Sequence, residues 1–229
     1  MKKIVITQSN YIPWKGYFDL INMADEFVYY DDVQYTKLDW RNRNKIKTAQ
    51  GEEWLTIPVS KHSYEIKINE ATVAGNDWAR KHWFKLQNAY AKAKYFKEYK
   101  KYFEEIYMNI NHQYLCDVNY EFIKAVNSIL NITTPIHKST DFVTVSGKTE
   151  RLVDLCKQLK ATEYLCGPAA KVYLDETLFN REGMIVTWMD YSGYQEYGQL
   201  YPPFVHGVSI LDLIFNEGPN ATQYMKSFN

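Results

Sequence analysis

The chain is poor in cysteine, with three in 229 residues. They are an odd number without CxxC spacing, so the sequence indicates neither a disulfide framework nor a zinc site. We expect buried, inert thiols, with Cys166 as the one exception to test, because it lies at the carboxyl end of a predicted strand. No hydrophobic run approaches the ~20 residues that a membrane-spanning helix needs. The opening MKKIVITQ is too short and too polar for a secretory signal. We therefore expect a cytoplasmic protein with no membrane insertion.

Neither sign of charge is in excess, with 27 Lys+Arg against 27 Asp+Glu. A neutral chain has no overall field that would attract nucleic acid or an anionic membrane. Because the densest positive charge lies in one short segment, few phosphates could be neutralised at once. We expect no nucleic-acid partner, and any anion site must be local.

Several signatures of common sites are also missing. The loop after the first predicted strand has neither GxGxxG nor the P-loop motif, so it is not a dinucleotide or phosphate site of those types. No Ser/His/Asp triad can be recognised by spacing, and we expect no metal site. The sequence identifies no cofactor and gives no oligomeric state.

Aromatic residues, in contrast, are abundant: 20 Tyr, 6 Trp and 11 Phe make up 16% of the chain. Aromatic side chains with a polar tip suit half-wet surfaces such as sugar or nucleotide clefts and protein interfaces. The alternative is a core built with tyrosine. Composition alone leaves both explanations open.

Strand-like and helix-like patterns alternate along nearly the whole chain. Strands are predicted at 3–7, 26–31, 54–59, 135–139, 162–166 and 184–190, and helices at 17–23, 78–109 with a break near 91–94, 116–130, 146–160, 171–180 and 209–216. This order predicts an α/β fold: an open, mostly parallel, doubly wound (Rossmann-like) sheet with helices on both faces. We expect a single domain over residues 1–229, with a helical segment at about 78–130. An aromatic, Pro/Gly-rich loop at about 191–207 is expected across the carboxyl edge of the strands.

The polar segment from Gln8 to Lys47 is the predicted functional region, because open α/β sheets bind ligands at strand ends. Its first bend offers Gln8, Tyr11 and Trp14. Residues 13–17 loosely echo the P-x-H-x-G-H turn of nucleotidylyltransferases. The histidines are absent and the spacing is one residue short, so the echo supports the fold more than the reaction.

An acidic cluster, Asp31, Asp32 and Gln34, follows the second predicted strand. Two carboxylates there could hold Mg²⁺, act as a base or bind sugar hydroxyls. Alternatively, one of the two carboxylates caps the following turn and the other carboxylate is exposed to solvent. We name Asp31 and Asp32 as candidate catalytic residues and Gln34 as a candidate binding residue.

A basic segment comes next, with candidate binding residues Trp40, Arg41, Asn42, Arg43, Lys45 and Lys47. Guanidinium groups bind phosphate in a bidentate way, and an indole ring can stack on a base or sugar. The alternative is a solvated basic loop. The alternation of arginine with asparagine favours a phosphate-bearing ligand, preferably a diphosphate.

Among the histidines, His82 at the start of the long helix is the candidate general base, with a pKa lowered by the helix dipole. A surface histidine without a role is the alternative, and His62 is a weaker candidate.

These segments together resemble the WbqC-like protein family. The resemblance rests on Gln8–Phe18, Asp31–Lys47, WLTIPV at 54–59, Lys81-His82 with Tyr90, Tyr164–Asp175 and Tyr197–Gly218, so it covers nearly the whole chain. Two residues depart from the family's pattern: Ser9 replaces a proline and Cys166 a serine. The resemblance implies a role in biosynthesis of O-antigen and other surface polysaccharides, and it marks Asp212 as a further family-patterned position.

Three functions remain open. The first is a transferase acting on a nucleotide-activated amino sugar, possibly by acyl or aminoacyl transfer, with a nucleoside diphosphate sugar as ligand. The second is an ATP-dependent nucleotidyl-transferring or adenylate-forming enzyme. The third is a non-enzymatic module that binds a glycan or a protein of a polysaccharide assembly.

Overall fold

The computed structural model describes residues 1–60, 65–75 and 77–228. At its centre lies a five-stranded parallel sheet with the order β5-β2-β1-β6-β7. The strands are β1 (Lys3–Thr7), β2 (Glu26–Tyr29), β5 (Ile136–Lys138), β6 (Glu163–Cys166) and β7 (Ile185–Trp188). The chain builds outward from β1 on one side and then crosses to the other, which is the doubly wound arrangement that the sequence predicts.

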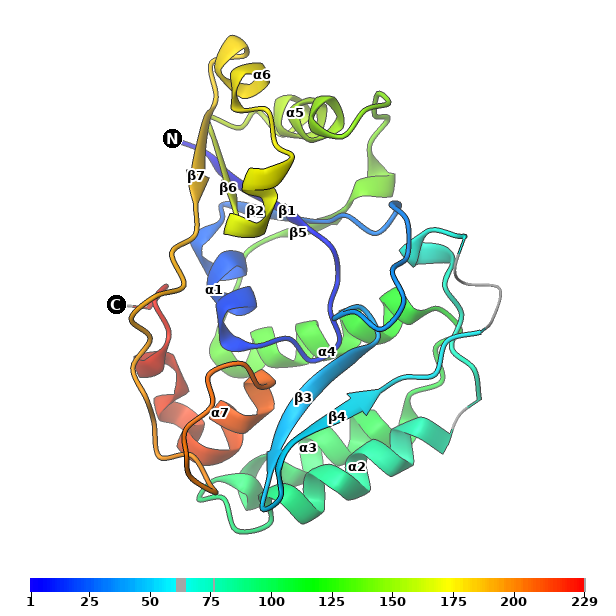
Figure 1. The fold of residues 1–229 in the computed structure, drawn as a ribbon, viewed down its shortest axis with the longest axis vertical. Coiled ribbons are helices and arrows are strands. Elements are labelled where there is room, and N and C mark those ends of the chain that lie inside the picture. Colours follow the sequence, from blue (N-terminus) through cyan, green and yellow to red (C-terminus); the bar gives the residue numbers. More distant parts are fainter. Residues whose placement is uncertain (61–64, 76, 229) are drawn as a thin grey trace.

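Alternate residues of β1 enter two separate hydrophobic cores. Val5 packs with residues of α1 (Lys15–Met23) and α4 (Leu115–Leu130), whereas Ile4 and Ile6 pack with residues of α5 (Thr149–Gln158) and α6 (Glu176–Arg181). Successive side chains of a strand point to opposite faces, so each face needs its own cover. Figure 1 shows α5 and α6 on one side of the sheet and α1 and α4 on the other. The predicted helices on both faces are confirmed.

The second half of the basic segment, from Arg43 to Lys47, lies in a strand, whereas Trp40, Arg41 and Asn42 precede it. β3 (Arg43–Thr48) pairs antiparallel with β4 (Gly51–Thr56) in a two-stranded sheet separate from the parallel one. The strand predicted at 54–59 thus begins and ends three residues earlier, at Gly51–Thr56, and it lies outside the parallel sheet. Gly51 has φ +106°, a conformation that favours glycine, and it allows the tight return between the two strands.

Two long helices support this hairpin. α2 (Asp77–Tyr90) contacts β3 and packs against α3 (Phe96–Asn109). Together with α4 they make up the helical segment predicted at about 78–130. The break predicted near 91–94 separates α2 from α3.

The C-terminal part of the chain contains a further α-helix. After β7 the chain has no helix or strand until α7 (Ile210–Glu217), which is followed by the 3-10 helix η5 (Gly218–Tyr224). The hydroxyl of Ser209 accepts the backbone N–H of Leu211 at 3.3 Å, as the predicted helix cap requires. The helix predicted at 171–180 was wrong in part. Pro168–Val172 is a 3-10 helix, and α6 begins only after its N-cap, Asp175.

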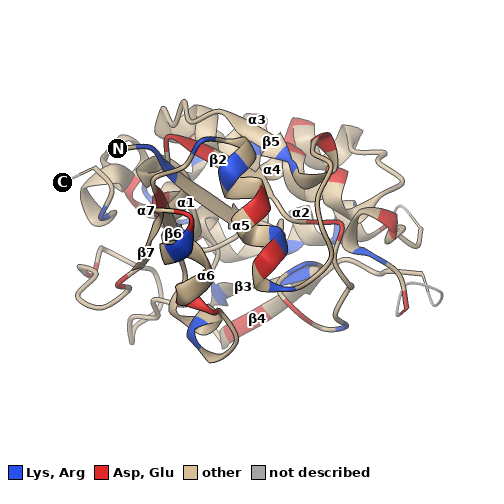
Figure 2. Ribbon diagram, turned by 90° about the horizontal axis from the view of Figure 1, so that it is seen from above, with Lys and Arg blue, Asp and Glu red and all other residues tan. Residues whose placement is uncertain are grey.

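Charge and hydrophobicity follow the expectations from composition. Figure 2 shows acidic and basic residues interspersed along the same elements. In the described part of the chain, no helix has both the length and the apolar character needed to cross a bilayer.

Candidate functional site

The carboxyl ends of the parallel strands form the edge at which open α/β folds bind ligands. The strand order reverses at β1, which lies between β2 and β6. Two cavities flank this point. The α5 cavity is bounded by Thr7, Gln8, Tyr30, Lys148, Arg151 and Tyr173 among others. The α4 cavity is bounded by Tyr29, Asp31, Asp32, Asn69, Asp117 and Lys138 among others.

The α5 cavity has a volume of about 710 Å³ and a basic side. Lys148 and Arg151 line it, whereas Glu150 of the same helical turn lines a different hollow. The N-cap residue Lys148 makes no side-chain capping hydrogen bond, although the carboxylate of Glu150 packs against Gly147 at this helix start. Gly147, with φ +113°, turns the chain into the helix. An uncapped helix N-terminus beside two cations favours an anion, because the N–H groups and the helix dipole both attract negative charge.

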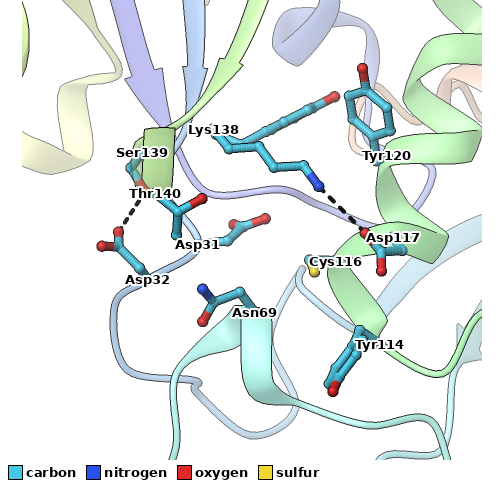
Figure 3. Close-up of a pocket in the computed structure, with 11 residues that line it drawn as sticks. Asp31, Asp32, Asn69, Tyr114, Cys116, Asp117, Tyr120, Lys138, Ser139 and Thr140 are labelled. Carbon is cyan, nitrogen blue, oxygen red and sulfur yellow. Dashed lines mark hydrogen bonds and ion pairs between the residues drawn. The ribbon is translucent and has the colours of Figure 1, made fainter. Parts of the chain in front are cut away.

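The α4 cavity, of about 200 Å³, has a buried carboxylate at its centre. Asp31 is 8% exposed, and its Oδ1 accepts the backbone N–H of Ser9 at 2.8 Å. Burial raises the pKa of Asp31, although the hydrogen bonds from Ser9 and the charges of Arg41 and Lys138 oppose the rise. In Figure 3 the ammonium of Lys138 turns towards Asp117, across the pocket from Asn69. A buried carboxylate with a raised pKa is a candidate general base or cation-binding group.

An ion pair between Asp32 and Arg151 joins the two cavities. Asp32 lines the α4 cavity and also accepts the hydroxyl of Ser139 at 2.5 Å. Arg151 lines the α5 cavity, and its Nε donates to the hydroxyl of Thr144 at 2.9 Å. Asp32 therefore holds Arg151 in place. Because Asp32 is engaged in this ion pair, Asp31 is the better candidate of the two for proton transfer.

Two further predicted residues adjoin these cavities. Gln8 lines the α5 cavity, and its side-chain oxygen accepts a hydrogen bond from Arg41. Arg41 also forms an ion pair with Asp39 at 3.2 Å. The Nε of Arg41 is buried and has no partner among the described residues. Of the four basic residues proposed for a diphosphate, Arg41 is the one beside the strand edge.

The first bend and the basic segment do meet at a third pocket. This indole cavity is lined by Asn10, Pro13, Trp14, Trp40, Asn44 and Gly207, and has a volume of about 270 Å³. None of these six residues is charged, so the pocket suits a sugar or base ring better than a phosphate. Trp14 and Trp40 thus line one cavity, and the stacking of either ring on a ligand stays a prediction.

The remaining basic candidates contact neighbouring side chains, although Nε of Arg43, like that of Arg41, is buried without a partner among the described residues. The guanidinium of Arg43 lies 4.1 Å from the ring centroid of Trp54, and Lys45 forms an ion pair across the hairpin at 2.6 Å. The ammonium of Lys47 is buried and donates to Gln199 at 2.9 Å. None of the three lines the α5, α4 or indole cavity. Their role as diphosphate ligands stays a prediction that these contacts do not favour.

The two asparagines of the basic segment hold the backbone. Asn42 donates to the carbonyl of Ile57 at 2.9 Å. Asn44 donates to the carbonyls of Tyr11 and Ile12 at 3.1 and 3.0 Å. The two asparagines that alternate with arginine in this segment thus have a structural role, since their side chains bind backbone carbonyls.

His82 lies away from both strand-edge cavities, at the wall of a separate cavity of about 520 Å³ that Asp77, Lys81 and Lys85 also line. It is 5% exposed, and its Nδ1 is 2.9 Å from the hydroxyl of Tyr11, which in turn is 2.7 Å from that of Tyr107. Burial lowers the pKa of His82 to about 4, with a hydrogen bond to the backbone of Thr56 opposing the shift. The expected direction of the shift holds, but its main cause is burial and not the helix dipole. Tyr11 is likewise a core residue.

Asp212 and Gln34 have different surroundings. Asp212 is fully buried and accepts hydrogen bonds from Tyr90, Tyr197 and Gln199 at 2.9, 2.5 and 2.8 Å. Through Tyr197 and Gln199 it anchors the irregular segment after β7. Gln34 is exposed and forms an isolated β-bridge with Lys67. His62 lies outside the described residues.

No activated thiol accompanies these groups in the described structure. Cys116 lines the α4 cavity, but burial raises its pKa to about 12. Burial likewise raises the pKa of Cys166 to about 12. Both are thiols at neutral pH and weak nucleophiles, as the sequence predicts.

Sequence reasoning missed the basic side of the α5 cavity and two polar groups of the α4 cavity. Gly147-Lys148-Thr149 reproduces the end of the P-loop motif, but Phe142 occupies the position of its first glycine. That partial match at a helix start was the available signal for Lys148. Tyr29 and Asn69 gave no signal, because their place depends on the packing of distant segments.

Comparisons with known proteins agree over almost the entire chain. Residues 8–224 match the WbqC-like protein family. The protein named Uncharacterized protein Rv1507c of Mycobacterium tuberculosis is 49% identical over 227 residues, which span 99% of this chain and 98% of that protein. No solved structure gives a significant match.

Proposed function

The chain belongs to the WbqC-like protein family, and we propose that it is a transferase acting on a nucleotide-activated sugar in the biosynthesis of surface polysaccharide. The group transferred is an acyl or aminoacyl group, and the sugar is an amino sugar. The phosphates of the nucleotide bind in the α5 cavity. This assignment moves the diphosphate from the basic strand β3 to the start of α5.

The observation that carries the proposal is the convergence of two cations and an uncapped helix start on a cavity at the point where the strand order reverses. Lys148 supplies a mobile ammonium and Arg151 a planar fork, both suited to phosphate oxygens. The volume of about 710 Å³ lies within the range of small-molecule sites. Charge, shape and place in the fold thus support the same class of ligand.

Chemistry is assigned to the neighbouring carboxylate. Asp31 would accept the proton of the attacking amine or hydroxyl, because a carboxyl with a raised pKa holds a proton more readily at neutral pH. Asp32 would keep Arg151 oriented towards the phosphates. His82 is not assigned this role, since its ring lines neither strand-edge cavity.

Calorimetry with UDP-, GDP- and dTDP-linked sugars tests the proposal. The wild-type protein should bind at least one of them saturably. Lys148→Ala should weaken that binding by roughly tenfold, the value of one charge-assisted hydrogen bond. Lys157→Ala, with the same loss of charge at the other end of α5, is the matched control and should leave the affinity unchanged. Absence of saturable binding, or equal effects of both substitutions, would reject the proposal.

The indole cavity favours a second candidate function, that of a glycan-binding module. Trp14 and Trp40 offer ring surfaces, and Oδ1 of Asn10 is buried without a partner among the described residues. In that case a neutral oligosaccharide should bind to the wild-type protein and not to Trp40→Ala. Nucleoside diphosphate sugars should then give no binding.

A further inference from the structure

The α4 cavity contains hydrogen-bonding groups that nothing in the described structure satisfies. Tyr29 is 3% exposed, lines the cavity, and its hydroxyl has no hydrogen-bond partner among the described residues. Oδ1 of Asn69, another lining residue, is also buried and unpartnered within the same residues. A buried polar atom without a partner costs free energy. Both groups would be satisfied by a ligand.

The cavity also holds a negative charge without a paired cation. The hydrogen bonds to the Asp31 carboxylate come from Ser9, and no lysine or arginine of the described chain forms an ion pair with it. Lys138 also lines the cavity, but its ammonium faces Asp117 at 3.7 Å, and its side chain is 54% exposed. Figure 3 shows this lysine directed away from Asn69. Arg41 and Lys138 offset the charge of Asp31 only from a distance, so a cation inside the cavity could pair with this carboxylate directly.

The unsatisfied groups specify the ligand. Oδ1 of Asn69 and the carboxylate of Asp31 accept hydrogen bonds, and a tyrosine hydroxyl can accept one. A group that carries several N–H donors and a positive charge therefore matches all three. An organic cation with several N–H donors is the ligand that matches these groups, and Mg²⁺ is the competing ligand that the experiment below separates from it.

We propose that the α4 cavity binds the primary ammonium group of a small molecule, through Asp31, Asn69 and Tyr29. The volume of about 200 Å³ corresponds to about seven water molecules at ~30 Å³ each, so an amino acid or an amino sugar is of suitable size. Binding of this amine does not require the nucleotide.

Calorimetry at pH 7 with ethanolamine and D-glucosamine tests this site in the absence of nucleotide. Ethylene glycol and D-glucose are the uncharged counterparts of the two amines. We expect saturable binding of at least one amine and none of its counterpart. Amide shifts in NMR spectra should place the bound amine beside Ser9 and Asn69.

Three variants locate the binding. Tyr29→Phe removes an unpartnered hydroxyl and should leave the unfolding midpoint unchanged or raised, while amine binding weakens several-fold. Asp31→Asn should weaken amine binding by roughly tenfold or more. Asp190→Asn, at an exposed position, is the control and should bind like the wild type.

The site would be rejected if neither amine bound saturably at tens of millimolar, or if Mg²⁺ bound there in place of the amines. It would also be rejected if Tyr29→Phe and Asp31→Asn both bound the amine like the wild type. None of these results bears on the nucleotide, whose binding at α5 is measured separately. Failure of this proposal and failure of the proposed function are therefore distinguishable.

Discussion

The backbone N–H of Ser9 donates a hydrogen bond of 2.8 Å to Oδ1 of Asp31, and so links the exit of β1 to the exit of β2. The Ser9 hydroxyl accepts the side-chain N–H of Asn119 at 3.1 Å, which joins α4 to the same point. The family pattern that this chain resembles has proline here, and proline has no N–H to donate. Asp31 therefore has a donor that the usual residue would not provide.

Substitutions at Ser9 should move the pKa of Asp31 in a defined order. Its hydrogen bonds from Ser9 lower a pKa that burial raises. Ser9→Ala keeps the backbone donor and should raise the pKa moderately; Ser9→Pro removes both donors and should raise it further. Carbon-13 NMR titration of the carboxyl group measures the order. A carboxyl group whose pKa is higher in the folded than in the unfolded protein stabilises the fold at a pH below its unfolded-state pKa. This stabilisation is lost as the pH rises through the folded-state pKa. Ser9→Pro should therefore lose more stability than Ser9→Ala between acid and neutral pH. Equal pKa values in the two variants would contradict this account.

Acid should destabilise the protein through His82. Its folded pKa is about 4 against an ordinary value of 6.5. The unfolded chain therefore binds a proton that the folded chain does not, and stability falls as pH decreases from about 6.5 to 4. The full effect is about 3 kcal/mol in the free energy of unfolding. Urea unfolding of the wild type and of His82→Gln between pH 7 and 4 measures it. The variant should lose clearly less stability over this range, and equal losses would exclude His82 as the cause.

Asp212 should matter for stability more than for ligand binding. Asp212→Ala leaves Tyr90, Tyr197 and Gln199 without their shared acceptor and should cost about 3 kcal/mol or more. Asp212→Asn keeps one acceptor oxygen and should cost less. Urea unfolding measures both, and limited proteolysis should show earlier cleavage after β7 in Asp212→Ala. Loss of nucleotide binding in a fully stable Asp212→Ala would instead place this residue in the site.

The Asp32–Arg151 pair should show strong coupling. Their side chains are only 11% and 17% exposed, so water screens the pair less than it would at the surface. A double-mutant cycle with Asp32→Asn and Arg151→Gln should give a coupling energy of about 1–3 kcal/mol in unfolding. The single variant Asp32→Asn should also weaken nucleotide binding, because Arg151 loses its orientation. Additive effects would mean that the two side chains act independently.

The sequence predicted the elements whose hydrophobic pattern is local. Residues 3–7 form a short run rich in β-branched side chains, and the strand observed there has the predicted bounds. The break between α2 and α3 was equally visible. β3 was not, because its buried positions include Asn44 and Lys47, whose polar atoms are satisfied by distant segments.

The site was predictable only in part, for the same physical reason. The carboxylates after β2 could be placed at the carboxyl edge, since strand ends converge there. The burial of His82 depends on Tyr11, far away in the chain, and no local pattern reveals such a contact. The cavity beside α5 is likewise bounded by segments far apart in the chain, among them Gln8, Tyr30 and Arg151.

A crystal structure with a nucleoside diphosphate sugar bound would test the central claim most directly. The account predicts phosphate oxygens within hydrogen-bond distance of Lys148, Arg151 and the first backbone N–H groups of α5. Phosphates bound along β3 beside Arg43 and Lys45, with the α5 cavity free of ligand, would contradict it.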